Sequence, residues 1–441
     1  MNRDLTNGTV TKSMLLFSAP MIMGNLLQQL YNVADTYIVG KYIGPEALAA
    51  VGSSFTLMTF LTSIILGLCM GSGIVFSMLF GARNEERLKS SFFMSFLFIG
   101  IVTVILNLSV LIFIDPLLKL LQIPPEILME TKSYLQVIFY GIIFTFFYNY
   151  FASLLRGMGN SFIPLVFLAI AALLNIVLDV LFITSFDMGV AGAAWATIIS
   201  QAVSAVCVTL YCFWKLPMVR LKRRDCHLDL VVLQDIFQYS ILTCVQQSIM
   251  NFGILMIQGL VNKFGVAVMA AFSAAVKIDS FAYMPVQDFG NAFSTFIAQN
   301  HGAGKKERIQ QGIRSAIKIA LFFCIIISIG VYVFARPLML IFIKPEELEI
   351  LSIGIQYLRI EGAFYCGIGC LFLLYGYYRG IGKPGVSVVL TIISLGTRVI
   401  LAYAFASIPA IGLVGIWWAI PIGWILADVV GLLYYRRLRW H

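Results

Sequence analysis

The sequence predicts an all-helical integral membrane protein built from two similar halves. Of the 441 residues, 60% are hydrophobic and only 12% are charged, and the mean hydropathy is +0.93. The apolar residues form about a dozen long runs joined by short polar segments. Several short motifs occur twice at nearly the same spacing, which indicates an internal repeat.

Each apolar run is long enough to cross a bilayer, because a hydrocarbon core of about 30 Å needs about 20 mainly apolar residues in a helix. The twelve predicted spans are residues 14–39, 47–80, 90–114, 131–155, 162–184, 189–213, 231–262, 266–299, 311–334, 350–376, 384–406 and 411–435. The first run continues well past the length of a signal-peptide core and lacks a convincing cleavage site, so we expect it to remain as the first helix.

The basic residues indicate how the spans are oriented. Of the 30 lysines and arginines, 20 lie in the two termini and in alternate joints on one side of the predicted bilayer. Cytoplasmic loops carry such an excess of basic residues. We therefore expect a multi-pass protein of the plasma or bacterial inner membrane with both termini in the cytoplasm. The lipid bilayer then explains the net charge of +9 without a nucleic-acid partner.

The repeat relates the first half of the chain to the second. Phe80–Leu88 (FGARNEERL) matches His301–Ile309 (HGAGKKERI) at an offset of 221, and Arg156–Gly159 matches Arg379–Gly382 at an offset of 223. Because six spans return the chain to its starting side, the halves have the same orientation and are related by a pseudo-two-fold axis along the membrane normal. We predict a six-helix lobe over residues 1–214, a basic cytoplasmic linker over 215–230 and a second six-helix lobe over 231–441.

The matched RGxG motifs predict tight turns. Glycine adopts positive φ at low cost, and an arginine at such a turn can place its charge among the lipid headgroups.

Two acids inside apolar runs indicate that the functional site lies in the first half of the chain. Asp35 and Asp179 lie within predicted spans, whereas the matching positions in the second half hold Met256 and Ala402. A carboxylate in hydrocarbon is costly, so an acid that occurs there usually marks an ion or proton pathway.

Several motifs occur in a characteristic order. They are Ser18-Ala19-Pro20, Asn32–Thr36 (NVADT), the duplicated GAR-type and RGxG turns, and Gly189–Thr197 (GVAGAAWAT). In these features the chain resembles the multidrug and toxic compound extrusion (MATE) family over essentially its whole length. The resemblance implies two lobes around a V-shaped cleft, and export of small organic molecules driven by a proton or sodium gradient. It implies no enzymatic activity and no cofactor, and we expect a monomer.

The resemblance is closer to the archaeal and related proton-coupled bacterial branch, and it places the coupling site on Asp35, Asn175, Asp179 and Thr197. Asn175 and Asp179 are four residues apart and so share one helix face. By the helix rise of 1.5 Å per residue, Asp35 lies roughly 32 Å and Asp179 roughly 26 Å from the cytoplasmic starts of their helices, and Thr197 lies about 12 Å below the outer end of its own. The oxygen ligands suit Na⁺, and a desolvated pair of acids suits a proton. The sequence permits both.

Structural roles are the alternative for these residues. Asp35 could cap or hydrogen-bond the backbone of a broken helix, and Asn175 could form a hydrogen bond between two helices. Thr197 could hydrogen-bond the backbone of its own helix. Pro20 removes a backbone hydrogen bond from the first span, so we expect a gating bend there, with a fixed kink as the alternative.

The substrate pocket and the second lobe are less well marked. The candidate pocket residues are Tyr31, Gln28, Met23 and Glu361. The interior charges of the second lobe are Lys277, Asp279, Asp288, Arg359, Glu361, Arg398 and Asp428. Arg398 is at the position that matches Asn175. The sodium-coupled branch is expected to use acids in spans 7 and 10, but span 7 has only Asp235 at its edge, which argues against a complete second cation site. Glu361 in span 10 leaves this alternative open. Pairing of Lys277 or Arg398 with an acid is the simpler expectation.

Two other functions compete with drug export. A flippase for a lipid-linked precursor would share the fold but should have a strongly cationic cavity and usually extra spans. A membrane-embedded transferase would need polar catalytic loops or an acidic metal motif, and the sequence has neither.

Overall fold

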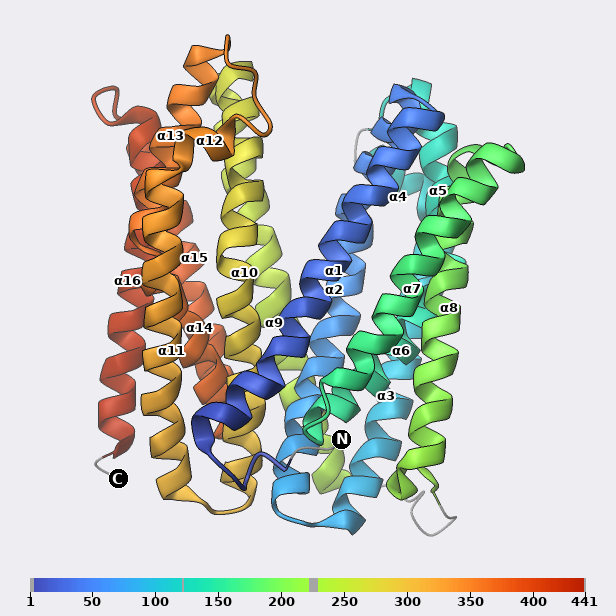
Figure 1. Cartoon of the computed structure of the whole chain (residues 1–441), viewed down its shortest axis with the longest axis vertical. Helices are drawn as coiled ribbons and strands as arrows, with labels where there is room; N and C mark the ends of the chain where they lie inside the picture. Colours follow the sequence, from blue (N-terminus) through green and yellow to red (C-terminus); the bar gives the residue numbers. More distant parts are fainter. Residues whose placement is uncertain (1–3, 121–122, 222–228, 440–441) are drawn as a thin grey trace. The chain divides into compact units, whose positions relative to one another are not determined.

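The computed structural model describes residues 4–120, 123–221 and 229–439, and within these ranges the secondary structure is helical (Figure 1). Ten of the described helices are long and apolar enough to cross a membrane, and the number rises to twelve if each of two bent helix pairs forms one span. The predicted fold class, an all-helical membrane protein, is therefore confirmed.

The helices follow the predicted spans closely. In the first half they are α1 (Val10–Tyr42), α2 (Pro45–Gly81), α3 (Glu85–Ile112), α4 (Ile114–Leu120), η1 (Pro125–Ile127), α5 (Leu128–Tyr140), α6 (Ile142–Gly157), α7 (Phe162–Val180), η2 (Leu181–Ser185), α8 (Gly189–Lys215) and η3 (Pro217–Val219). In the second half they are α9 (Leu230–Val261), η5 (Asn262–Phe264), α10 (Val266–Gly302), α11 (Lys306–Val333), α12 (Ala335–Met339), α13 (Leu348–Ala363), α14 (Tyr365–Gly380), α15 (Pro384–Ala406) and α16 (Gly412–Arg439).

The chain forms two compact units whose limits fall inside helices. The N-unit comprises Asp4 and residues 19–244, and the C-unit comprises residues 5–18 and 245–439. The start of α1 therefore belongs to the C-unit, and the start of α9 belongs to the N-unit. The lobe limits 1–214 and 231–441 stay a prediction, and residues 222–228 of the predicted linker lie outside the described residues.

The repeat is visible in the backbone. α2 and α10 both have 37 residues, and α3 and α11 both have 28. Pro116 and Pro337 each lie in the short helix that follows, α4 or α12. Four pairs of equivalent residues adopt positive φ. These pairs are Gly44 and Gly265, Arg83 and Gly304, Gly159 and Gly382, and Gly189 and Gly412.

The two glycines of each RGxG turn have different tasks. Gly159 and Gly382 adopt φ of 81° and 85°, as predicted. Gly157 instead permits close helix packing, because a Cβ there would lie 3.0 Å from the carbonyl oxygen of Gly73. The headgroup role predicted for the arginines is wrong for Arg379, which is buried and donates from Nη2 to Asn291 Oδ1 at 2.9 Å.

Spans 4 and 10 are bent, whereas the sequence predicted one continuous helix for each. α5 and α6 meet at 46°, and α13 and α14 meet at 52°. Gly141 lies at the first bend, where a Cβ would approach Ile198 Cγ1 to 2.5 Å. The span bends at a residue that lets α8 pack against it closely, and an apolar run alone does not reveal this contact.

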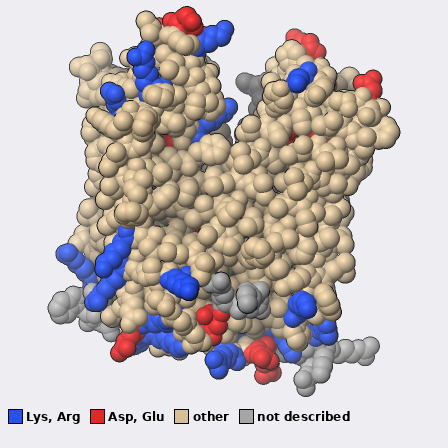
Figure 2. Space-filling model, in the orientation of Figure 1, with Lys and Arg blue, Asp and Glu red and all other residues tan. Residues whose placement is uncertain are grey.

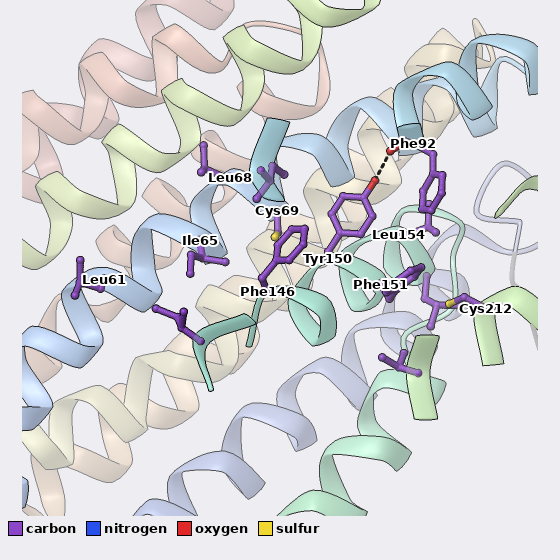
Figure 3. Packing of buried hydrophobic residues seen from close by; sticks show 14 of the residues in the cluster. Leu61, Ile65, Leu68, Cys69, Phe92, Phe146, Tyr150, Phe151, Leu154 and Cys212 are labelled. Atoms are coloured by element: carbon purple, nitrogen blue, oxygen red, sulfur yellow. Dashed lines mark hydrogen bonds between the residues drawn. The ribbon is translucent and has the colours of Figure 1, made fainter. Parts of the chain in front are cut away.

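Aromatic side chains fill the core of the N-unit between α2, α3 and α6 (Figure 3). Tyr150 is fully buried, and its hydroxyl donates to the carbonyl oxygen of Phe92 at 2.6 Å and lies 2.8 Å from Ser95 Oγ. A buried tyrosine needs such partners, because an unpaired hydroxyl is costly in an apolar core.

The first half of α9 packs on α2 through small residues. A Cβ on Gly67 would lie 2.6 Å from Cys244 Cα, and one on Gly71 would lie 2.4 Å from the carbonyl oxygen of Tyr239. Ser72 and Ser240 bring their hydroxyl oxygens to 2.9 Å. Close approach through a GxxxG motif is typical of membrane helices, whose association relies on packing and on interhelical hydrogen bonds.

The charged side chains on the face shown in Figure 2 lie mostly at the helix ends, with a broad uncharged band between them. This distribution is typical of helices that cross a bilayer, since charged groups are costly in hydrocarbon.

Candidate functional site

Four predicted site residues lie in the N-unit on three helices. Asp35 is on α1, Asn175 and Asp179 are on α7, and Thr197 is on α8. All four are buried, with exposed fractions of 8% for Asp35 and 0% for Asp179. α7 and α8 pack along each other, so their polar residues share one interface. Tertiary packing thus gathers polar groups from segments more than 130 residues apart.

The amide of Asn175 links α7 to α8. In the orientation that satisfies both ends, its nitrogen donates to Asp179 Oδ2 at 3.2 Å and its oxygen accepts from the backbone nitrogen of Thr197 at 3.2 Å. The same amide lies 3.3 Å from Thr197 Oγ1, which donates to the carbonyl oxygen of Ala193 at 3.1 Å. The structural roles considered for Asn175 and Thr197 are therefore both present.

The two acids face each other. The carboxyl groups of Asp35 and Asp179 lie within hydrogen-bonding reach of one another. One oxygen on each, Oδ1, is buried and has no hydrogen-bond partner among the described residues. A buried carboxylate oxygen without a partner is costly. The pair could therefore take up a proton or coordinate a small cation.

Two tyrosines complete the surroundings of the acids. Tyr31 on α1 and Tyr134 on α5 both interact electrostatically with Asp35 and Asp179. Tyr31 is also one of the predicted substrate-pocket residues, and that role stays a prediction. Tyr134 could not be singled out from the sequence, since α5 approaches the acids only in the folded unit.

The other predicted pocket residues belong to different units. Gln28 and Met23 are exposed on α1, and Met23 has an exposed fraction of 59%. Glu361 belongs to α13 of the C-unit and is fully buried.

Pro20, the predicted gating residue, lies inside α1, which continues through it from Val10 to Tyr42. The limit between the two units falls between Ser18 and Ala19, directly before this proline.

The C-unit contains its own buried charged cluster. Tyr365 Oη donates to Asp279 Oδ1 at 2.7 Å, and Tyr357 Oη donates to Oδ2 at 3.5 Å. Glu361 and Arg398 interact electrostatically with Asp279. Both carboxylate oxygens of Glu361 and Nε of Arg398 lack a hydrogen-bond partner in the described part of the chain.

The pairing expected for Lys277 and Arg398 takes a different form. Within the described ranges neither side chain has an ion pair, and Lys277 lies over the ring of Phe342 at 6.0 Å. Arg398 lies near two acids, so it offsets part of their charge without a direct contact.

Comparison with known proteins gives relatives along the whole chain. The family model MatE matches residues 20–181 and again residues 243–404, with starts 223 residues apart, as the repeat requires. The chain is 30% identical to the probable multidrug resistance protein YpnP of Bacillus subtilis, over 99% of this chain and 97% of YpnP. It is 25% identical to the multidrug export protein MepA of Staphylococcus aureus, over 98% and 94% of the two chains.

Solved structures share the fold. An outward-facing multidrug resistance MATE family transporter of the MOP superfamily has a TM-score of 0.92 and 28% identity to this chain, and the match covers 98% of this chain and 96% of that one.

Proposed function

The chain belongs to the MatE family of multidrug export transporters, and on this premise we propose that it exports small organic molecules, often cationic, in exchange for H⁺ or Na⁺. The protein is a multi-pass membrane transporter and not an enzyme. MATE transporters are cation-coupled. What is proposed for this chain is the ion, the substrate class and the residues that couple them.

The coupling site is Asp35 with Asp179, assisted by Asn175 and Thr197. The observation that carries this proposal is the buried contact between two carboxyl groups, each with one oxygen that has no partner in the described ranges. Two buried carboxylates close to each other repel, and a proton on one of them removes this repulsion, so H⁺ is the first candidate for the occupant. Na⁺ is the alternative, since carboxylate, amide and hydroxyl oxygens are suitable ligands for a hard cation.

Loading of this site is expected to act on α1. Asp35 and Pro20 lie on the same helix, and proline weakens the helix by removing one backbone hydrogen bond. We propose that occupation of the acid pair bends α1 near Pro20, closes the substrate pocket and expels the substrate.

The test is gradient-driven efflux of ethidium, a lipophilic cation, from energised membrane vesicles. We expect Asp35→Asn and Asp179→Asn to abolish efflux, because each removes a carboxyl group needed to bind the driving ion. Asp115→Asn is the matched control, since Asp115 is exposed and pairs with Lys132 at 2.6 Å at the protein surface. Undiminished efflux by either site variant would refute the proposed coupling site.

Two gradients identify the ion. Efflux is measured with a pH gradient at zero sodium and with a sodium gradient at constant pH. A proton occupant predicts that the pH gradient suffices, and dependence on sodium would assign the site to Na⁺.

The flippase alternative is less well supported. Such a protein needs a strongly cationic interior, whereas Arg398 is accompanied by two acids, Asp279 and Glu361.

We also propose that the protein is a monomer with both termini in the cytoplasm. Protease accessibility of terminal tags in sealed vesicles checks the orientation.

A further inference from the structure

The segment before α1 is held by a group of polar side chains in the C-unit. Arg308 donates from Nε and Nη2 to the carbonyl oxygen of Leu5 at 3.1 and 3.0 Å, from Nη2 to that of Asn7 at 2.7 Å, and from Nη1 to that of Gly8 at 2.7 Å. Lys305 Nζ donates to the carbonyl oxygen of Thr6 at 2.8 Å and to Asn7 Oδ1 at 3.2 Å. Residues 5–8 are thus bound through their backbone.

Two amide side chains at the end of α10 complete these contacts. The backbone nitrogen of Leu5 donates to Gln299 Oε1 at 3.0 Å, and Asn300 Nδ2 donates to the carbonyl oxygen of Leu5 at 3.2 Å. The side chain of Leu5 is completely buried. We name Gln299, Asn300, Lys305 and Arg308 the clamp. In Figure 1 the beginning of α1 lies beside the lower ends of α10 and α11.

The clamp is not simply a copy of the equivalent turn in the N-unit. Lys305 matches Asn84, whose Oδ1 caps α3 by accepting from the backbone nitrogen of Arg87 at 3.1 Å. Lys305 makes no such cap for α11. An N-cap stabilises a helix, and lysine cannot act as one because its ammonium group has no acceptor. At this position the second half has exchanged a helix cap for contacts with residues 6 and 7.

The clamp fixes one end of a helix that serves both units. Residues 5–18 belong to the C-unit, whereas α1 from Ala19 onward, including Asp35, belongs to the N-unit. In the N-unit α1 packs on α7, where Gly24 faces Leu168. Any movement of one unit against the other must therefore deform α1 near the unit limit, where Pro20 removes a backbone hydrogen bond.

We propose that Arg308 and Lys305 are positioning residues for transport. They anchor residues 5–8 to the C-unit throughout the cycle, so that unit movement is converted into bending of α1 at Pro20. This inference rests on the proposed export by alternating access. The new element is that residues 5–8 remain bound to Arg308 and Lys305 while the substrate crosses the membrane.

The experiment adds a covalent bond between the start of α1 and α11 beside the clamp. Thr11 Oγ1 on α1 and Ser315 Oγ on α11 lie 2.7 Å apart. Ser315 is about two turns beyond Arg308 and lies outside the clamp. Cysteines at these two positions place their sulfur atoms near bonding distance. We expect Thr11→Cys with Ser315→Cys to keep ethidium efflux after oxidation, because a permanent anchor does not hinder the cycle. Loss of efflux on oxidation, with recovery on reduction, would mean that the segment must detach, and would overturn the proposal.

A rescue experiment distinguishes a positioning role of Arg308 from a role in folding. Arg308→Ala is expected to lower ethidium efflux at least tenfold at normal membrane abundance, and oxidation of the cysteine pair in this background should restore at least half of it. Reduction should remove the gain. A failure to rescue would contradict the anchor role. If Arg308→Ala does not accumulate in the membrane, Lys305→Ala, which removes two contacts, is tested in the same way.

The controls distinguish this proposal from the proposed function. Arg314→Ala removes an exposed arginine from the same helix and should leave efflux unchanged. Thr11→Cys alone should show no effect of oxidation, although native cysteines are present. If the unaltered protein does not export ethidium, the proposed export of lipophilic cations fails. If it does and only the rescue fails, the anchor alone is refuted.

Discussion

Replacing Gly71 by alanine should loosen the contact between α2 and α9 in the N-unit. The added Cβ would lie 2.4 Å from the carbonyl oxygen of Tyr239 and 2.5 Å from Ser240 Cα. These are backbone atoms, which cannot turn away like a side-chain end, so α9 would have to move. Overpacking of this kind costs about 1–3 kcal/mol, and contact with backbone places Gly71→Ala at the upper end of this range.

A smaller effect opposes this strain. Alanine is favoured over glycine inside a helix by about 1 kcal/mol, so the net loss for Gly71→Ala is about 2 kcal/mol. A domain of about the size of the N-unit, residues 19–244, loses about 2–4 °C in melting temperature for each kcal/mol of lost stability. We therefore expect the apparent melting temperature to fall by about 4–8 °C, measured by tryptophan fluorescence of the purified protein in detergent.

The matched control is on the same helix. Gly52 also lies in α2, but a Cβ there meets nothing within 4 Å. Gly52→Ala should melt at the same temperature as the unaltered protein or slightly higher. Equal melting temperatures for Gly71→Ala and Gly52→Ala would refute the argument that α9 is packed through the small residues of α2.

Three further changes test other parts of the structure by the same melting measurement. Tyr365→Phe removes the 2.7 Å hydrogen bond to buried Asp279 and should cost about 1.5–3 kcal/mol, and an unchanged melting temperature would contradict that bond. Gly382→Ala forces a Cβ at φ 85° and should cost about 1–2 kcal/mol, whereas Gly396→Ala, a helical position with open space, should cost nothing. Asn84→Ala removes the cap of α3 and should cost about 1 kcal/mol, and a gain in stability would argue against the cap.

The spans were predictable because a membrane helix depends on local composition. About 20 apolar residues must follow one another, and a sequence shows this directly. The bends in spans 4 and 10 were not predictable in the same way. Gly141 marks the first of them, but its effect depends on the approach of Ile198 from α8.

The coupling residues were partly predictable. Asp35 and Asp179 stand out because an acid in an apolar run is rare and costly. Asp279 and Glu361 stand out for the same reason. Tyr134 and the tyrosines around Asp279 could not be found in this way, since a tyrosine acquires such a role only through its neighbours. The assignment of the site to coupling stays a prediction until the carboxyl groups are replaced.

The sequence by itself determined the fold class, the family, the repeat and the two acids of the N-unit, because composition, periodic motifs and isolated charges are local properties. Only the tertiary structure decided which unit holds each end of α1 and α9. It also showed that the clamp binds residues 5–8 and that Arg398 lies near two acids. These features depend on contacts between segments up to about 300 residues apart. Local composition carries no record of such contacts, because they form only when distant helices pack together.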